Sequence, residues 1–523
     1  MEEKKEERNW LPDTVSGIGK IMSEYLSPGV YVEEFDSGPM PIEGVSTSIT
    51  GFIGLAERGP VGGLPVPVSC FGEFRTIFGY YLPENQFGPY CYLAYAVEHY
   101  FANGGSRCYI SRVVPEDAKM ASCILEGGQM RLTAKAPGAW GNKLSVSFKP
   151  SAPDKFDITI RSMDIYMEEV ISAVSFNPDD SDYIANKLTK SKLVSIEVNT
   201  CDTKAPSCLS PAGVGAGEFY SVTLSEGSDG SVDAVNAKVF TGKCQEFGKR
   251  TGLQAFLDNK DVSIIAIPGI TDVEVQKDLI AHCDKLGNRF AVLDLPQGKN
   301  SVADVQSHRE IFNSPNAAFY HPWIEISDPL MKRSIFVPPS GAVAGIYSRT
   351  DDERGVHKAP ANEVVRGCTG VEYMYSQEEQ DRINPGGINL IRVFPGMGIR
   401  VWGARTCSSD SVWKYVNVRR LFIFLEESIR QSITWAIFEQ NNQILWARMT
   451  ITIGNFLTSA WRSGMLAGVI PDEAFFIKAD KSTMTSDDID NGRFICLIGV
   501  AVAKPAEFIT FTIVQKTGTN DIK

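Results

Sequence analysis

No part of the chain approaches the roughly 18 consecutive apolar residues that a membrane-spanning helix needs, so we expect no membrane insertion. The first eight residues, MEEKKEER, also lack the apolar core of a secretory signal peptide. The 11 cysteines are odd in number, scattered, and contain no CxxC pair, which is unlike a disulfide framework. These absences predict reduced thiols and a protein that is cytoplasmic during its assembly.

Motifs for catalysis and for metal or nucleotide binding are missing as well. The 5 histidines form no HExxH pattern and no close metal spacing. Gly298 and Lys299 follow a predicted strand, but Leu293 and Asn300 stand where a Walker loop needs glycine and Ser or Thr. Ser340 lacks the GxSxG turn of a hydrolase nucleophile. The sequence therefore predicts no catalytic residue, no cofactor and no metal.

The charge balance narrows the possible partners. The net charge is -12, which disfavours a nucleic-acid coat and a binder of anionic membranes. The acidic run Asp487, Asp488 and Asp490 is either a solvated turn or a polar contact between subunits. A length of 523 residues suggests several domains.

The middle of the chain alternates between strand and helix patterns. Strands are predicted at 262–267, 290–295 and 317–326, with helices at 273–286 and 302–312 between them. This alternation is typical of an open α/β sheet. Earlier segments fit the same sheet, with strands at 48–55 and 107–114 and a buried helix at 89–103.

The part that follows combines strands with two long helices. After a turn at 384–387, strands are predicted at 388–393, 399–404 and 413–418. From Phe422 apolar residues recur every three or four positions, which predicts a helix. A second helix is predicted at 443–463, with Asn442 as its cap and Gly464 at its end.

Long blocks at both ends and in the middle point to one family. Near the C-terminus the chain reads NPGGINLIRVFPGMGIRVWGARTCSSD, YVNVRRLFIFLEESI and TMTSDDIDNGRFICLIGVAVAKPAEFI, in the middle VPPSGAVAGIYSRTDDERGVHKAPANE, and near the N-terminus SPGVYVEEFDSGPMPIEGVSTSITGFIGLAERGP. These blocks are similar to contractile tail sheath proteins of myophage tails, R-type bacteriocins and phage-tail-like contractile injection systems. Such long ungapped blocks are far more specific than a short motif.

The resemblance implies a multidomain fold of α/β and α+β classes. The expected fold consists of an open α/β domain, a β-rich insertion, and a C-terminal α+β sheath domain that the N-terminal arm completes. The expected parts are a mobile tail at 1–25, an arm and linker at 26–47, an α/β domain at 48–114 plus 244–356, an outward-facing insertion at 115–243, and an inner C-terminal domain at 357–523 with a strand arm from about 507.

The two arms are the expected assembly elements. The C-terminal segment 508–514 alternates apolar and polar residues and so predicts a strand with one face to bury. A terminal strand offers unpaired backbone groups to another chain, and the resemblance implies that both arms add strands to neighbouring subunits. The arm residues that we expect to take part are Val30, Tyr31, Val32, Phe35, Phe508, Ile509, Phe511 and Ile513.

A tube-facing surface is a further hypothesis. Arg448 and Arg462, 14 residues apart on the predicted helix 443–463, share almost the same azimuth. They are candidates for pairing with acidic groups on an inner tube. An alternative of equal weight is that both arginines form salt bridges within their own domain.

The expected function is that of a sheath subunit. The resemblance implies helical polymerisation around an inner tube and contraction that drives the tube through a target envelope. The implied partners are further copies of the chain, the tube protein, baseplate and terminal cap proteins, and possible sheath paralogues, in a phage tail or a released particle. A doubly wound α/β enzyme and a static, non-contractile filament protein are the alternatives.

Overall fold

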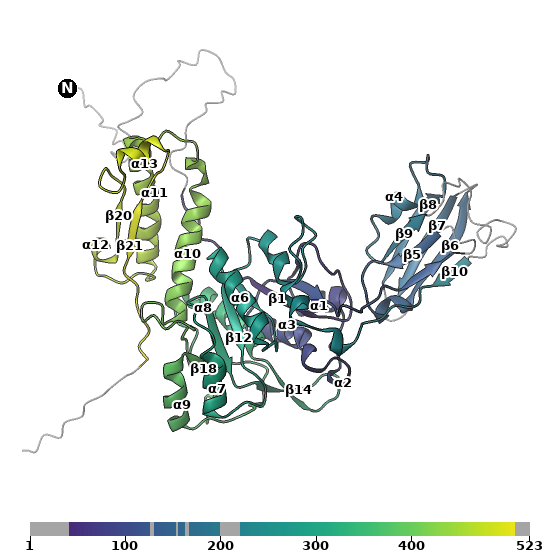
Figure 1. Cartoon of the computed structure of the whole chain (residues 1–523), viewed down its shortest axis with the longest axis horizontal. Coiled ribbons are helices and arrows are strands. Elements are labelled where there is room, and N and C mark those ends of the chain that lie inside the picture. Colours follow the sequence, from purple (N-terminus) through teal and green to yellow (C-terminus); the bar gives the residue numbers. More distant parts are fainter. Residues whose placement is uncertain (1–40, 126–129, 153–154, 163–166, 199–219, 508–523) are drawn as a thin grey trace, which may run out of the picture. The chain divides into compact units, whose positions relative to one another are not determined.

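The computed structural model describes residues 41–125, 130–152, 155–162, 167–198 and 220–507 (Figure 1). Buried hydrophobic side chains form three separate clusters within these residues. We call them the sheet cluster, the insertion cluster and the C-terminal cluster, after the elements that supply them. The first cluster surrounds a large sheet, the second lies within residues 121–224, and the third is supplied mainly by two long C-terminal helices.

A nine-stranded sheet supports the sheet cluster. In spatial order its strands are β16 (Glu363–Val364), β19 (Gly398–Val401), β18 (Ile388–Phe394), β13 (Ala317–His321), β12 (Phe290–Asp294), β11 (Ile264–Ala266), β1 (Thr50–Leu55), β3 (Cys108–Val113) and β2 (Val66–Val68). The strands from β18 to β3 are parallel. Strands β1, β12 and β13 are buried along their whole length, as expected for a parallel sheet covered on both faces.

The helices of this part connect the parallel strands or flank them. They are α1 (Phe71–Phe78), α2 (Glu84–Phe87), α3 (Leu93–Ala102), α5 (Ala237–Thr241), α6 (Val273–Leu286), α7 (Val302–Arg309), α8 (Ser340–Arg354) and α9 (Gln377–Ile383). A separate three-stranded sheet has the order β15 (Ser334–Val337), β14 (Ile324–Ser327), β17 (Gly370–Val371). Short 3-10 helices occur at Gly88–Tyr90, Ala139–Lys143, Val232–Ala234, Gly252–Asp258, Asn384–Gly386 and Thr434–Ala436.

Helix α6 shows how local sequence sets the limits of an element. The Asp272 carboxylate accepts hydrogen bonds from the backbone N–H groups of Glu274 and Val275, so it caps the first turn. Gly287 ends the helix at φ 70°, a left-handed conformation that favours glycine. The helix predicted at 273–286 is confirmed.

The insertion consists mainly of antiparallel strands. A four-stranded sheet has the order β10 (Tyr220–Thr223), β6 (Leu144–Ala152), β7 (Lys155–Ser162), β8 (Glu168–Ser175), and a three-stranded sheet has the order β4 (Ser122–Ile124), β5 (Met130–Ala134), β9 (Val194–Val198). One short helix, α4 (Ile184–Leu188), lies between β8 and β9 in the sequence. The strands predicted at 143–148 and 156–161 correspond to β6 and β7.

The C-terminal part pairs helices with a small sheet. Its elements are α10 (Val416–Ser432), α11 (Gln443–Arg462), α12 (Pro471–Ala474), β20 (Phe475–Lys478), α13 (Ser486–Asp490) and β21 (Leu497–Val500). Asn442 accepts hydrogen bonds from the N–H groups of Ile444 and Leu445, which confirms it as the cap of α11. Helix α10 links two clusters, because Val416 and Ile423 belong to the sheet cluster while Leu421 and Leu425 belong to the C-terminal cluster.

Three sequence-based predictions need correction. Strands β18 and β19 were expected in a C-terminal domain starting at residue 357, but β18 pairs in parallel with β13 and both strands belong to the nine-stranded sheet. Local periodicity identifies a strand without identifying its sheet. The strand predicted at 413–418 is absent from this described stretch, where only an isolated bridge at Tyr415 precedes α10. The strand predicted at 317–326 is two strands in different sheets.

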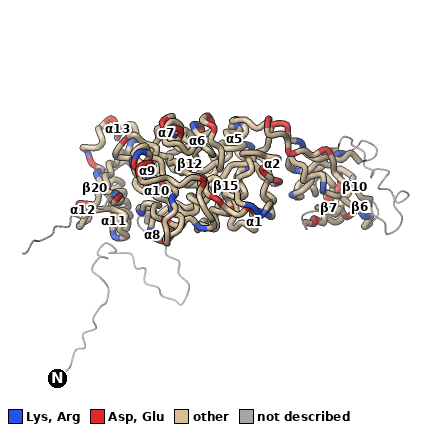
Figure 2. The backbone as a smooth tube through the Cα atoms, turned by 90° about the horizontal axis from the view of Figure 1, so that it is seen from below, with Lys and Arg blue, Asp and Glu red and all other residues tan. Residues whose placement is uncertain are grey.

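Acidic and basic residues are interspersed along the described backbone (Figure 2). In the ranges that the structure describes, no helix is both long enough and apolar enough to cross a membrane.

Candidate functional site

The segment that enters the sheet from the N-terminal side lies against α10. We call its residues 41–46 the strap. Ile42 is buried in the C-terminal cluster, and the backbone N–H of Val45 donates to Ser428 Oγ at 3.1 Å. A Cβ atom on Gly44 would come within 2.9 Å of the outer edge of the Phe424 ring, so a larger residue here would displace that ring. The strap therefore follows a stripe of α10 with four-residue spacing.

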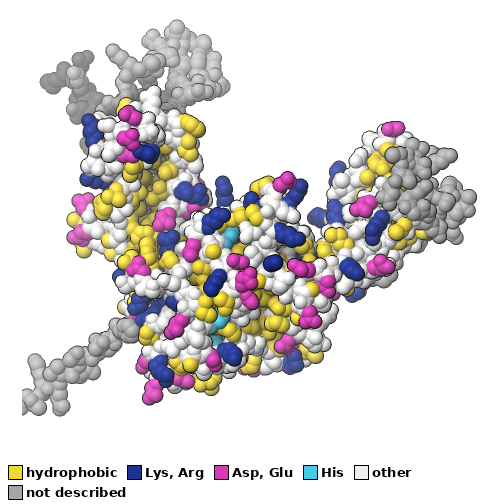
Figure 3. All heavy atoms as spheres, viewed as in Figure 1, with side chains coloured by type: hydrophobic (Ala, Val, Ile, Leu, Met, Phe, Trp, Pro, Cys, Tyr) yellow, Lys and Arg dark blue, Asp and Glu magenta, His cyan; other side chains and the backbone are white. Residues whose placement is uncertain are grey.

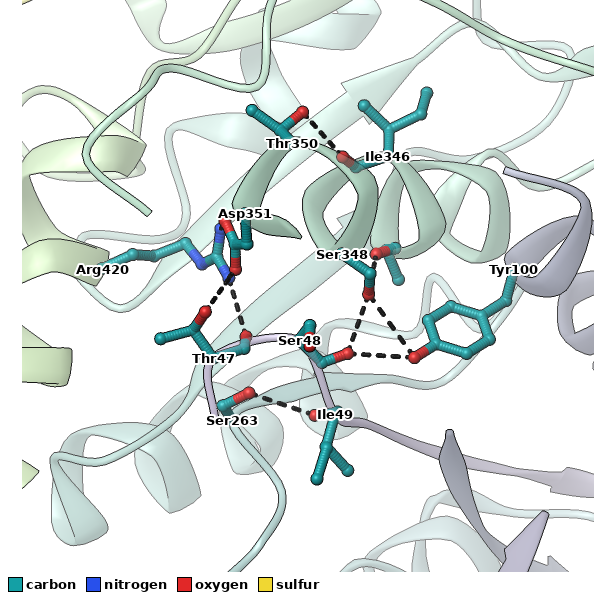
Figure 4. Close-up of polar contacts among 11 residues, drawn as sticks. Thr47, Ser48, Ile49, Tyr100, Ser263, Ile346, Ser348, Thr350, Asp351 and Arg420 are labelled. Carbon is teal, nitrogen blue, oxygen red and sulfur yellow. Dashed lines mark hydrogen bonds and ion pairs between the residues drawn. The ribbon is translucent and has the colours of Figure 1, made fainter. Parts of the chain in front are cut away.

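A buried ion pair holds the chain directly after the strap. The two terminal nitrogens of Arg420 donate to the Asp351 carboxylate at 2.9 and 2.6 Å, and one of them also donates to the Thr47 carbonyl at 2.8 Å (Figure 4). The Thr47 hydroxyl donates to the same carboxylate at 2.6 Å. We call Thr47, Asp351 and Arg420 the lock.

The lock is a well-compensated buried charge pair. The Asp351 and Arg420 side chains are each only 4% exposed. The Arg420 guanidinium also lies 4.6 Å from the centre of the Tyr347 ring, a cation–π contact. A bidentate arginine–carboxylate pair fixes geometry as well as energy, so the lock ties the incoming chain to α8 and α10 together.

Beyond the lock the chain becomes part of the large sheet. The Ser48 carbonyl accepts from the Tyr100 hydroxyl at 3.0 Å and from Ser348 Oγ at 2.8 Å (Figure 4). The Ile49 carbonyl accepts from the Ser263 N–H at 3.0 Å. Among the described residues, attachment is thus dense from residue 47 onward and sparse at 41–46.

The root of the C-terminal segment has an ionic anchor of its own. Arg405 donates from Nε and Nη2 to the two carboxylate oxygens of Glu507 at 2.7 and 2.6 Å, and the Tyr415 hydroxyl donates to Glu507 at 3.0 Å. The Lys414 ammonium nitrogen lies 3.6 Å from the Glu507 carboxylate. Burial by itself would raise the pKa of Glu507, but the hydrogen bonds and charge of Arg405, with Tyr415 and Lys414, outweigh it and hold the pKa below its usual value.

Strands β20 and β21 form a two-stranded sheet with unpaired outer edges among the described residues. Their inner residues join the C-terminal cluster, whereas Phe476 and Leu497 are 55% and 53% exposed. Figure 3 shows hydrophobic side chains at the surface over this part of the chain. The Phe476 ring covers Gly499 on the opposite strand, where a Cβ atom would lie 2.1 Å from the ring. A sheet of two strands is only marginally stable in isolation and leaves backbone groups free to pair.

The predicted arm residues lie outside the described residues. This applies to Val30, Tyr31, Val32, Phe35, Phe508, Ile509, Phe511 and Ile513, whose role stays a prediction. Sequence reasoning also missed the residues that anchor both roots, because no local motif links Thr47 to Asp351 and Arg420, or Arg405 to Glu507.

The two tube-facing candidates differ in their surroundings. The Arg448 guanidinium stacks 4.5 Å from the centre of the Trp435 ring, so it is partly engaged within its own domain. Arg462 is exposed at the end of α11, and no acidic residue in the described part of the chain pairs with it. Their role toward a tube is untested by this geometry.

Other residues singled out for chemistry have structural partners. Ser340 is buried at the start of α8 and donates from Oγ to Asp294 at 2.7 Å. Burial raises the pKa of Asp294 to about 6, against hydrogen bonds from Ser340 and Gly269 that lower it. Asp487 and Asp488 lie in α13, and each pairs with Arg493 at 2.8 Å. Within the described ranges no group of His, Cys, Asp and Glu is arranged to hold a metal ion.

Two family models match consecutive parts of this chain. The model of the phage tail sheath protein central domain matches residues 249–407, and the model of the phage tail sheath C-terminal domain matches residues 408–516. Together they span 249–516, or 268 of 523 residues. The chain belongs to the phage tail sheath family. The limit between the two models falls shortly after β19, in agreement with the corrected position of β18 and β19.

Known sheath proteins are similar in sequence and in fold. This sheath protein is 24% identical over 287 residues to a prophage major tail sheath protein of Pseudomonas aeruginosa strain UCBPP-PA14, covering 53% of this chain and 72% of that protein. Its fold is similar to the sheath complex of an extracellular contractile injection system in the contracted state, with a TM-score of 0.58, 24% identity, and coverage of 94% and 99%. The helical sheath of the anti-feeding prophage in the contracted state gives a TM-score of 0.56, 24% identity, and the same coverage of 94% and 99%. The protein is a structural sheath subunit.

Proposed function

We propose that this sheath protein polymerises helically around an inner tube and that the polymer contracts to drive the tube through a target envelope. The observation that carries the proposal is the open β20–β21 sheet beside two firmly anchored chain roots. A sheet that lacks neighbours within its own chain, combined with terminal segments that start from fixed points, suits exchange of strands between subunits.

In this proposal each arm adds a strand to the β20–β21 sheet of a neighbouring subunit. The N-terminal arm contributes Val30, Tyr31, Val32 and Phe35, and the C-terminal arm contributes Phe508, Ile509, Phe511 and Ile513. Each strand adds about three to six ladder hydrogen bonds at about 0.5–1.5 kcal/mol each. Because donor and acceptor are different surfaces, the contacts are heterologous, and heterologous contacts whose rotation does not close into a ring generate an open helix.

The partners follow from this assembly. The C-terminal domain faces the inner tube protein, with Arg448 and Arg462 as candidate contacts, and the insertion at 115–243 faces outward. Baseplate and terminal cap proteins bind the ends of the polymer, and sheath paralogues are possible neighbours. Assembly takes place in the cytoplasm, and the particle is a phage tail or a released injection system.

Contraction needs a metastable extended polymer. We infer that new packing between outer domains in the shorter, wider form supplies the free energy, while the arms keep the lattice connected. The similarity to sheaths solved in the contracted state supports this inference at the level of fold.

Electron microscopy of the purified chain and of two truncations tests the proposal. The intact chain should form hollow helical tubes of one diameter, with a second, wider lattice in whole particles. Chains that lack residues 1–35, or everything from Phe508 onward, should fold and remain monomeric, because the donor strands are lost while the three clusters stay intact.

Circular dichroism and sedimentation would confirm that each truncated chain is folded. Normal tubes from both truncated chains would refute the strand exchange. Tubes that never adopt a second lattice would identify a static filament protein, and compact monomers at high concentration would reopen the enzyme alternative.

A further inference from the structure

The attachment of the N-terminal root changes abruptly at Thr47. From residue 47 to residue 49 each backbone carbonyl accepts at least one hydrogen bond from Arg420, Tyr100 or Ser263. In the strap, Val45 donates one hydrogen bond to α10, and Ile42, 9% exposed, is the most buried residue. The chain is therefore held by two regions of different strength.

The lock cannot open cheaply. Separating Arg420 from Asp351 would leave a charge in a site where both side chains are 4% exposed. An unpaired buried charge is strongly unfavourable, and Thr47 would also lose its two hydrogen bonds to the pair. Any load on the N-terminal arm thus reaches α8 and α10 through this point.

The strap, by contrast, can leave α10 without exposing a charge. Glu43, Gly44 and Ser46 are already exposed. A cavity of about 290 Å³ is lined in part by Val45 and Ser46 of the strap and extends to Thr47 and Arg420 of the lock. Detachment exposes Ile42 and frees the Val45 N–H to bond with water.

We propose that the lock is the permanent anchor of the N-terminal arm and that the strap is a length reserve, bound to α10 in the extended sheath and released in the contracted one. The inference rests on the proposed function, in which contraction widens the lattice and moves joined subunits apart. With Thr47 still held in the lock, the five backbone steps from Ile42 to Thr47 span at most about 17 Å when the freed strap is fully extended. The arm can then stay paired with its neighbour while the two bodies separate.

A disulfide across the strap tests this reserve. The Val45 nitrogen lies 3.1 Å from Ser428 Oγ, which makes Val45→Cys with Ser428→Cys the pair to cross-link the strap to α10, and loss of two free thiols on oxidation shows that the disulfide has formed. The matched control is Ile49→Cys with Ser263→Cys, which lies beyond the lock, where the Ile49 carbonyl and the Ser263 N–H are 3.0 Å apart. Both variants carry serine at the exposed Cys70 and Cys244.

Whole particles built from each variant are first oxidised or reduced and are then triggered with urea. Contracted sheaths are counted by electron microscopy. We expect the oxidised strap variant to assemble extended sheath but to contract severalfold less often than the control, with recovery after reduction. Equal contraction of both oxidised variants would overturn the length reserve. Failure of wild-type particles to contract under the same trigger would instead overturn the proposed function.

A second variant tests the same idea in the opposite direction. Ile42→Ala weakens the strap, so its sheaths should contract at a lower urea concentration than wild-type sheaths. The control is Ile453→Ala, a deletion of the same size at a residue that is 1% exposed in the same cluster. An unchanged urea midpoint for Ile42→Ala, or an equal decrease for both variants, would contradict a specific role of the strap.

Discussion

At the scale of single residues, an ion pair between an arginine and a carboxylate anchors each end of the described chain, but the two pairs lie in different environments. Arg420 and Asp351 are 4% exposed each, whereas Glu507 is 19% exposed beside Arg405. Removing one member of a fully buried pair leaves the other charge uncompensated, whereas a partly exposed carboxylate can regain water. The two anchors should therefore respond differently to mutation and to pH.

We expect Asp351→Asn to lower the free energy of unfolding by about 3–5 kcal/mol, because the Arg420 charge stays buried without its partner. The comparison is Glu168→Gln in the exposed pair that Glu168 forms with Arg161 at 2.9 Å. That change should cost less than about 1 kcal/mol. Urea unfolding of the arm-truncated chain measures both, and equal effects would contradict the special status of the lock.

Glu507 should give a pH-dependent anchor. Its pKa is lowered in the folded protein, so the ionised anchor contributes its full stabilisation above the unfolded pKa of about 4.3 and loses it as pH falls through the folded value. The stability difference between wild type and Glu507→Gln should be constant at neutral pH and shrink in acid. Urea midpoints between pH 7 and pH 3 measure it, and a difference that does not change with pH would argue against an ionic anchor.

At the scale of elements, α10 and α11 divide the work of the C-terminal part. Helix α10 contributes buried residues to two clusters and holds the strap, whereas α11 buries one stripe and leaves another exposed. The exposed stripe of α11 includes Ile444, Ile451 and Arg462 and no acidic residue. A tube contact on this helix would thus combine the positive charge of Arg462 at the helix end with the exposed apolar side chains of Ile444 and Ile451.

Reversing both Arg448 and Arg462 to Glu should weaken assembly of extended sheath on tube and leave sheath-only polymerisation largely intact. A screened charge pair suits a contact that must release during firing. Because Arg448 also stacks on Trp435, the single change Arg462→Glu separates tube binding from domain stability. Co-sedimentation with tubes measures both variants, and undiminished binding by the double variant would rule out this helix as the contact.

At the scale of the whole molecule, separate clusters make separate functions possible. The insertion cluster draws its buried residues from 121–224 and shares none with the sheet cluster. Short antiparallel strands with their own core can vary without disturbing the sheet that carries the lock.

The bounds expected from the sequence, 115–242, include α5, whose Phe240 is buried in the sheet cluster, so the deletion should stop at residue 234. Replacing residues 115–234 by a short linker should therefore harm assembly less than a lesion in the region 384–468. Leu457→Asp is such a lesion, since Leu457 is completely buried in the C-terminal cluster. Quantitative electron microscopy of tubes at equal subunit concentration gives the ranking. If the deletion proves more harmful than Leu457→Asp, the insertion takes part in the lattice.

The sequence alone was sufficient for elements with strong local signals. Helix α6, the buried strand β12, and helix α11 with Asn442 as its cap follow from periodicity and, for α11, from the capping residue. Membership of the sheath family was equally evident from long blocks of residues, which the family models confirm. These features lie in short stretches of chain, where neighbouring residues determine the outcome.

The tertiary structure alone decided which distant segments meet. Strand β18 joins β13 rather than a C-terminal sheet, and Thr47 meets a carboxylate 304 residues away and an arginine 373 residues away. Such partners are selected by burial and by the need to compensate charge in a folded interior, not by any local pattern. The chain's family and helices could thus be predicted from its sequence, whereas the anchors of its two ends depend on side chains that only folding brings together.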